Sequence, residues 1–239
     1  MAEAGNRVLG GPVLLPGGRP ARGADRQVPI GRHGLPREEI RAVQRAKILD
    51  AFVAEVGDKG FAGTKVIDVC GRAAVSAKEF YTVFGSKDDC FFTAFDLGAE
   101  LVWAQGSAAF EQAEGLWEDR VRAAIQAMLE TLAANPAFCR LCIVEARYAG
   151  PDGMERLQAV IQRCRRLLGG DRQVEVPPGM PVDACESALV GGALRPLVDY
   201  VRAGRAGELA ELVPLLTYSI ALPVVGQQRA LRQLEAAGG

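Results

Sequence analysis

Residues 61–95 constrain the fold of this chain most strongly, because they contain two short helical patterns separated by a tight turn. In the first pattern, apolar residues recur at three- and four-residue spacing and form one face of a helix. They are Val66, Val69, Cys70 and Ala73. Ala74 and Val75 then supply small side chains at the turn, before a second helical pattern begins. This order predicts a helix-turn-helix, which makes DNA the first candidate partner.

The residues at the helix ends support this interpretation. Thr64 and Ser76 carry hydroxyls that can cap the first and second helix. Gly85 ends the second helix, and Ser86 is suited to cap the next one. Two aspartates follow Ser86 in the first helical turn, where the helix dipole favours negative charge.

The second helix of the motif has two different faces. Phe80, Val83 and Phe84 lie on one side and are expected to enter the small core. The side chains expected to point outward, where a major groove would meet them, are Ala77, Lys78, Tyr81 and Thr82.

The stretch resembles the DNA-binding domain of the tetracycline-repressor (TetR) family of bacterial transcriptional regulators. The resemblance is carried by Gly60-Phe61, Thr64-Lys65-Val66, Ala74-Val75-Ser76, Phe80-Tyr81, Phe84 and Ser86-Lys87. The sequence departs from the family at Ala74, where glycine is usual, and at Glu79, whose carboxylate would repel a facing phosphate.

The resemblance implies roles for seven residues. Ala77, Lys78, Tyr81 and Thr82 are expected to face base edges, with Lys78 suited to guanine and Ala77 to a thymine methyl group. The residues expected to grip phosphates are Thr64, Ser76, Tyr81 and Lys87. For Thr64 and Ser76 the alternative is plain capping, and for Tyr81 it is a packed ring with its hydroxyl in water.

At 239 residues the chain is long enough for two domains, and no strand-like alternation stands out. We therefore expect an all-α fold with an N-terminal three-helix helix-turn-helix domain and a C-terminal helical ligand-binding and dimerisation domain. The predicted divisions are a flexible basic arm over 1–36, the DNA-binding domain over 37–86 and the C-terminal domain over 87–239.

Charge is distributed unevenly along the chain. Residues 1–87 hold 14 Lys and Arg against 9 Asp and Glu, whereas the remainder holds 14 against 20. A basic N-terminal part suits a phosphate-binding module, although chance scatter of solvated charge is the alternative. The arm over 1–36 is expected to lie along DNA phosphates or to enter a minor groove. The alternative is that it is an inert tail.

Helical spacing predicts further helices between Gly and Pro breaks. The first begins near Pro36 or Arg37 and ends within 57–60, and a long one runs from about 87 to near 110. The later helices are expected over 116–134, 136–149, 151–168, 182–203 and 207–225.

The C-terminal domain is expected to provide the remaining partners. The resemblance implies a homodimer through the last two long helices, against the alternative of an intramolecular bundle, and an enclosed pocket for a small-molecule effector. The sequence does not identify that effector. Candidate pocket residues, each more often ordinary core or surface, are Trp103, Trp117, Met128, Phe138, Met154 and either Glu145 or Arg147.

Catalytic and metal chemistry have little support in the sequence. It has no GxSxG, HExxH or Walker loop, and His33 is the only histidine. Cys139 and Cys142 form the only CxxC, which indicates helical core residues rather than a zinc site or a redox sensor. We expect no cofactor, no metal and no enzymatic activity. With no secretory signal or long apolar run, we expect a cytoplasmic protein without a membrane partner.

These features predict a sequence-specific transcriptional regulator that binds double-stranded operator DNA. We expect a repressor that a small-molecule effector releases from its operator, rather than an activator. The alternative is a helical small-molecule-binding or scaffolding protein that no longer reads DNA. Glu79 and the absence of arginine from the second helix motivate that alternative.

Overall fold

The computed structural model describes residues 15–18, 37–169, 179 and 181–235. Within these ranges every regular element is helical, so the predicted all-α class is confirmed. The basic residues of the predicted arm lie outside the described ranges, as do Cys185's side chain and His33. The two boundaries between the three predicted divisions stay predictions.

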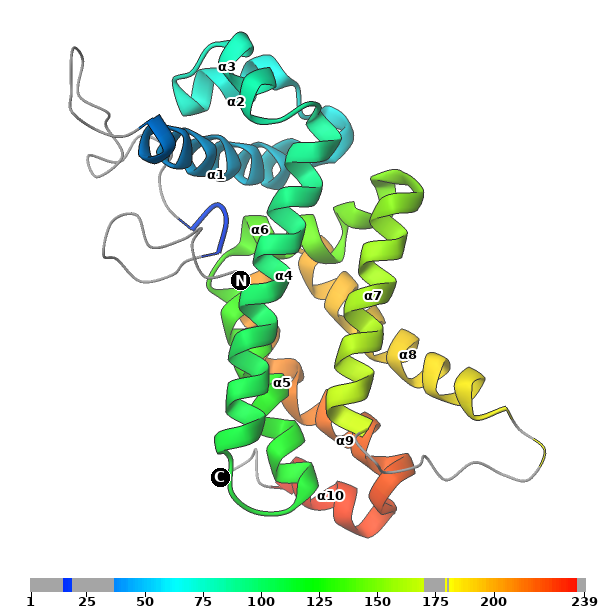
Figure 1. The fold of residues 1–239 in the computed structure, drawn as a ribbon. Helices are drawn as coiled ribbons and strands as arrows, with labels where there is room; N and C mark the ends of the chain where they lie inside the picture. Colours follow the sequence, from blue (N-terminus) through cyan, green and yellow to red (C-terminus); the bar gives the residue numbers. More distant parts are fainter. Residues whose placement is uncertain (1–14, 19–36, 170–178, 180, 236–239) are drawn as a thin grey trace.

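The helices at one end of the molecule are α1 (Arg37–Gly63), α2 (Val66–Ala73) and α3 (Ala77–Val83), which pack together as the predicted helix-turn-helix core (Figure 1). The long α4 (Lys87–Gln112) leads from this core along the rest of the molecule. The remaining elements are α5 (Trp117–Ala133), α6 (Pro136–Ile143), the 3-10 helix η2 (Glu145–Tyr148), α7 (Gly150–Gly169), α8 (Val182–Arg202), the 3-10 helix η3 (Ala206–Leu212), α9 (Val213–Val225) and α10 (Gln227–Glu235).

Aromatic rings form the core beneath the helix-turn-helix. Phe80 and Phe84 are completely buried, as predicted from their spacing. Phe91 of α4 packs edge-on against Phe52 and Phe61 of α1, with ring centroids 6.4 and 4.8 Å apart. Such edge-to-face pairs add to the free energy gained from burial. Since α4 carries one of these rings, the helix-turn-helix is joined rigidly to the helix that leaves it.

The first helix ends where the glycines predicted. α1 breaks at Gly60, whose φ of 73° lies in the left-handed region that glycine adopts without strain. Residues 61–63 then form a last turn that leads toward α2. The predicted end within 57–60 is therefore confirmed for the regular part of the helix.

The short α6 lies at the junction between the helix-turn-helix and the remaining helices. A Cβ atom added at Gly98 of α4 would lie 2.0 Å from the Phe138 ring, and one added at Gly57 of α1 would lie 2.7 Å from the Ala137 Cβ. Both close contacts between helices are possible only because glycine has no side chain. Glycine on α1 and on α4 thus lets α6 sit close to both helices.

Two predicted helices differ from the structure, and one helix was not predicted. The helix expected over 136–149 is α up to Ile143 and then tightens into η2, and the one expected over 207–225 starts as η3. The unpredicted helix is α10. That helix is held to α5 by Arg229, whose guanidinium donates to both oxygens of the buried Glu118 at 2.9 and 2.7 Å.

The stretch Ala206–Val225 is long and apolar enough, by length and composition, to cross a membrane. Only 33% of its most apolar window is buried within this single chain. One such helix is weak evidence for a membrane span, because helices that pack in protein interiors share this composition. Its exposed apolar surface is equally suited to another protein surface.

The turn of the motif contains a strained residue that yields a stability prediction. Ala74 has φ 55° and ψ 50°, a left-handed conformation that costs an L-residue about 1–2 kcal/mol. Ala74→Gly is expected to raise the free energy of unfolding by about 1 kcal/mol, measured by urea denaturation.

The matched control for this substitution is Ala73→Gly. Ala73 is the last residue of α2 and is fully buried, so glycine there should lower stability by about 1 kcal/mol. Equal losses from both substitutions would contradict the strain assigned to Ala74.

Candidate functional site

The exposed face of α3 is the first candidate site. The four side chains predicted to point outward, Ala77, Lys78, Tyr81 and Thr82, are all exposed. Tyr81 is 55% exposed, although its ring also contacts that of Phe80 with centroids 5.4 Å apart. The predicted orientation of this face is confirmed, and its contact with DNA stays a prediction.

A capping box defines the start of α3. Ser76 Oγ accepts from the Glu79 backbone N–H at 3.1 Å, and the Glu79 carboxylate accepts from the Ser76 N–H at 2.7 Å. The second Glu79 oxygen accepts from Gln44 Nε2 of α1 at 3.2 Å. The backbone hydrogen bond from Ser76 lowers the pKa of Glu79. Glu79 is thus an ionised part of the helix start that also ties α3 to α1.

Thr64 and Lys87, two of the residues predicted to grip phosphates, both donate hydrogen bonds to the backbone around the end of α1. Thr64 is almost fully buried and its hydroxyl donates to the Gly60 carbonyl at 2.8 Å, so the capping role predicted for it is wrong. Lys87 is half-buried, and its ammonium donates to the carbonyls of Phe61 and Thr64 at 3.0 and 3.3 Å. Phosphate contact by either residue stays a prediction.

An ion-pair network holds α2 against α1. Glu55 of α1 is buried, and its two oxygens lie 2.7 Å from Arg72 Nε and 2.7 Å from Lys59 Nζ. Lys59 also reaches Asp68 of α2 at 2.9 Å. Burial alone raises the pKa of Glu55, but hydrogen bonds from Lys59 and Arg72 outweigh it and lower the pKa. The network fixes the helix that precedes the turn to α3.

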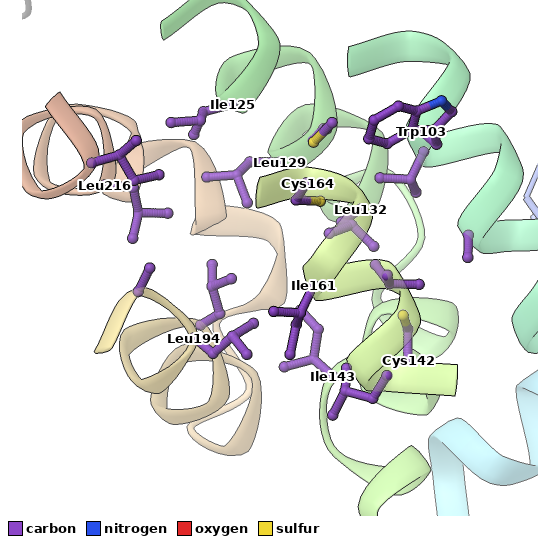
Figure 2. Close-up of a pocket in the computed structure, with 18 of the residues that line it drawn as sticks. Trp103, Ile125, Leu129, Leu132, Cys142, Ile143, Ile161, Cys164, Leu194 and Leu216 are labelled. Carbon is purple, nitrogen blue, oxygen red and sulfur yellow. The ribbon is translucent and has the colours of Figure 1, made fainter. Parts of the chain in front are cut away.

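The second candidate site is a cavity of about 240 Å³ between α4, α5, α6, α7, α8 and α9. Figure 2 shows Leu194 and Leu216 reaching in from one side, with Trp103 and Cys142 on the other. Among the described residues, no charged side chain lines the cavity. Its walls are aliphatic and aromatic side chains together with the thiols of Cys142 and Cys164.

The sequence identified only part of this lining. Trp103, Trp117 and Met128 line the cavity as suggested, whereas Phe138 is core and Met154 is exposed. Most lining residues are leucine, isoleucine and valine at ordinary helical spacing. Because core positions have the same spacing and composition, a single sequence carries no signal that separates the two.

The cavity thiols are protonated at neutral pH. Burial raises the pKa of Cys142 to about 12 and that of Cys164 to about 11. Burial also raises the pKa of Cys139, which is a core residue as predicted. Thiolates are the reactive and metal-binding form. In the described part of the chain, no group of acidic, histidine or cysteine residues is arranged to hold a metal ion.

Polar contacts connect the wall of the cavity to the helix-turn-helix. Arg140 of α6 donates to the Gly57 carbonyl of α1 at 3.2 Å. Glu145 of η2 is buried, accepts from the Phe61 N–H at 2.9 Å and also accepts from Arg140 Nε at 3.2 Å. These contacts meet α1 on both sides of its break at Gly60. The segment that contributes Cys142 and Ile143 to the cavity therefore also holds the end of α1.

Comparison with known proteins bears on the N-terminal helices. Residues 48–94 match the family model for bacterial regulatory proteins of the tetR family. The chain carries the DNA-binding domain of the tetR family. The match runs from within α1 into α4 and includes the whole of α2 and α3. The predicted resemblance is confirmed, and the match supports a DNA-binding transcriptional regulator. No curated protein matches the chain significantly.

Solved structures share the fold over about three quarters of the chain. FadR of Bacillus subtilis in complex with stearoyl-CoA is 16% identical with a TM-score of 0.61, covering 75% of this chain and 97% of that one. FadR of Bacillus halodurans is 15% identical with a TM-score of 0.64, covering 77% and 97%. PfmR of Thermus thermophilus, a tetR-family regulator, is 22% identical with a TM-score of 0.55, covering 77% and 96%.

The Glu55 network predicts a pH-dependent contribution to stability. Since the folded-state pKa of Glu55 is lowered, its contribution is present above the unfolded pKa and is lost as pH falls through the folded one. Glu55→Gln should therefore destabilise the protein most at about pH 7, and the difference from wild type should shrink between about pH 5 and pH 3. Chemical denaturation across this range measures it.

Glu111→Gln is the control for this experiment. Glu111 is exposed near the end of α4, and its substitution should change stability by no more than about 0.5 kcal/mol. A Glu55→Gln effect that stays constant down to about pH 3 would contradict the role of the ionised carboxylate.

Proposed function

We propose that this protein is a cytoplasmic, homodimeric transcriptional repressor whose affinity for operator DNA falls when an effector with a hydrocarbon chain occupies the C-terminal cavity. The DNA-binding part rests on the exposed α3 face within a tetR-family domain. The effector part rests on the apolar cavity and its connection to α1.

The α3 face has the chemistry for reading a major groove. Lys78 provides donors for guanine, Thr82 has a hydroxyl, and Ala77 can contact a thymine methyl group. The capping box leaves these side chains exposed on a helix whose start is fixed by Ser76. Tyr81 is placed to contact either a base edge or a phosphate.

The arrangement of Glu79 weakens the alternative of a protein that has lost DNA recognition. Its carboxylate is bound by Ser76 and Gln44. The residue that motivated that alternative therefore has a structural role in forming α3, and such a role is compatible with DNA binding.

The cavity favours an apolar effector. The cavity walls are hydrophobic and carry no charged groups among the described residues, so binding there is favoured when apolar ligand surface leaves water. A volume of about 240 Å³ is somewhat below the ~300–1,000 Å³ usual for drug-sized ligands, so a long chain requires side chains to move. The FadR of Bacillus subtilis, which has a similar fold, was solved with stearoyl-CoA. We extend that ligand class, an acyl chain on a polar carrier, to this cavity.

The route from the cavity to DNA runs through α4 and α6. Both helices line the cavity, α4 leads directly to the helix-turn-helix, and Arg140 and Glu145 bind the end of α1. A ligand that pushes these helices apart changes the angle of the DNA-binding domain. Effector binding then shifts the population between dimers that fit the operator and dimers that do not.

The proposed dimer uses α8 and α9. On α8, Cβ atoms added at Gly191 and Gly192 would meet nothing within 4 Å, which leaves room for a close-packed helix. On α9, Leu215 and Leu222 are 46% and 36% exposed. A second copy of the same surface would cover these groups and place two α3 helices for successive major grooves.

The test of this function is selection of bound duplexes from random DNA by the purified protein, repeated at two salt concentrations. A regulator should enrich a roughly palindromic sequence, with affinity falling steeply as salt rises. Weak binding without an enriched sequence would reject the DNA-binding part of the proposal.

Substitution of Lys78 tests the recognition face. Lys78→Ala is expected to cost about 1–3 kcal/mol at one base position and to relax the preference there, as measured by repeating the selection. Lys87→Ala should weaken binding to all sequences alike and also lower stability, because Lys87 bonds the end of α1. Altered specificity from Lys87→Ala instead would contradict the assignment.

Filling the cavity tests the effector proposal. Ala99 of α4 lines the cavity, and Ala99→Phe should retain operator binding but lose its response to stearoyl-CoA. In the wild type, that ligand should weaken operator binding at least about 5-fold in an equilibrium binding assay. Ala104→Phe, at an exposed position on the same helix, is the control and should keep the response. Identical responses from both variants would place the ligand elsewhere.

A further inference from the structure

Four residues near the N-terminus, Leu15–Gly18, lie against the junction between the helix-turn-helix and the C-terminal helices. Figure 1 shows this short blue segment beside α6 and below α1. Leu15 is only 7% exposed and belongs to the main hydrophobic core. The Gly18 N–H donates to the Leu15 carbonyl at 2.9 Å, which closes the segment into a turn. This placement differs from the flexibility predicted for the whole of 1–36.

The segment is bound from both sides by buried polar side chains. On the α1 side, Asp50 is 5% exposed and accepts from the Gly17 N–H at 2.5 Å. On the α6 side, Asn135 is 6% exposed and its amide donates to the Pro16 carbonyl at 2.8 Å. Asn135 also caps α6 by accepting from the Phe138 N–H at 3.1 Å. One turn thus joins α1 of the DNA-binding domain to the start of α6.

Only glycine fits at the centre of this turn. Gly17 has φ 84°, which side chains rarely adopt, and an added Cβ would lie 2.6 Å from Val53 Cγ1. Val53 is fully buried in α1 and cannot move away easily. The neighbouring Gly18 is exposed, so a methyl group added there meets solvent more readily than one added at Gly17.

We propose that Leu15–Gly18 form a strap that holds α1 against α6 and thereby sets the orientation in which α3 is presented to DNA. Two hydrogen bonds from different domains and one buried leucine carry the contact. Because α6 also lines the cavity, the strap lies on the same connection that effector binding would use.

The substitution Gly17→Ala in the full chain tests the strap, with Gly18→Ala as the matched control. In Gly17→Ala, the rate of hydrogen–deuterium exchange should rise about tenfold or more in residues 50–56 and 135–141. A tenfold rise corresponds to a loss of ~1.4 kcal/mol of interaction free energy. Exchange in α9 should stay unchanged, as should all exchange in Gly18→Ala. Unchanged exchange in Gly17→Ala, or an equal rise in α9, would overturn the proposal.

A pair of deletions separates the strap from the residues before it. Removal of 2–18 should reproduce the exchange pattern of Gly17→Ala, whereas removal of 2–13 should leave the wild-type pattern. The reverse result, with the shorter deletion alone raising exchange at the junction, would overturn the proposal.

DNA affinity tests whether the strap orients α3. Of the experiments on the strap, only this one rests on the proposed function. On the selected duplex, Gly17→Ala should bind about tenfold more weakly than Gly18→Ala. Faster exchange with unchanged affinity would overturn the orienting role. If the wild type selects no duplex, the proposed function fails while the exchange data still decide whether the strap exists.

Discussion

The close approach of α6 to both α1 and α4 is the constraint on which the rest of the structure depends. It requires glycine at 57 and 98, because any side chain there would collide with Ala137 or Phe138. The packed ring of Phe138 then fixes α6 between the helix-turn-helix and the cavity. Interiors this dense transmit displacement, since they lack free space to absorb it. A displacement of the cavity wall is therefore expected to displace α1 as well.

Polar contacts give this packed junction a defined geometry. Arg140 and Glu145 bind the backbone of α1 around its break, and Asn135 and Asp50 bind the N-terminal turn. Hydrogen bonds between buried groups are costly to leave unmade, so they select one arrangement more sharply than apolar contacts do. The domain junction thus combines dense packing with a small number of directional contacts.

Much of the fold was predictable from the sequence because its signals are local. The spacing of Val66 to Ala73, the Ser76 cap and the break at Gly60 each report the conformation of their own segment. The capping role of Thr64 was predicted wrongly because its hydroxyl bonds back to Gly60 in the preceding turn instead of capping α2. The cavity and the contacts of Glu145 join residues distant in sequence, which a single sequence does not encode in any visible pattern.

The composition of the cavity wall has a consequence for selectivity. A site that pairs with polar groups rejects a molecule that lacks them, because its own groups are then left unsatisfied. Walls made of leucine, isoleucine, valine and tryptophan offer no such penalty and discriminate only through size and shape. One methylene more or less changes binding by only ~1–3 kcal/mol. Under the proposed function, the protein would respond to a graded series of related molecules, and the abundance of each would decide which one governs the response.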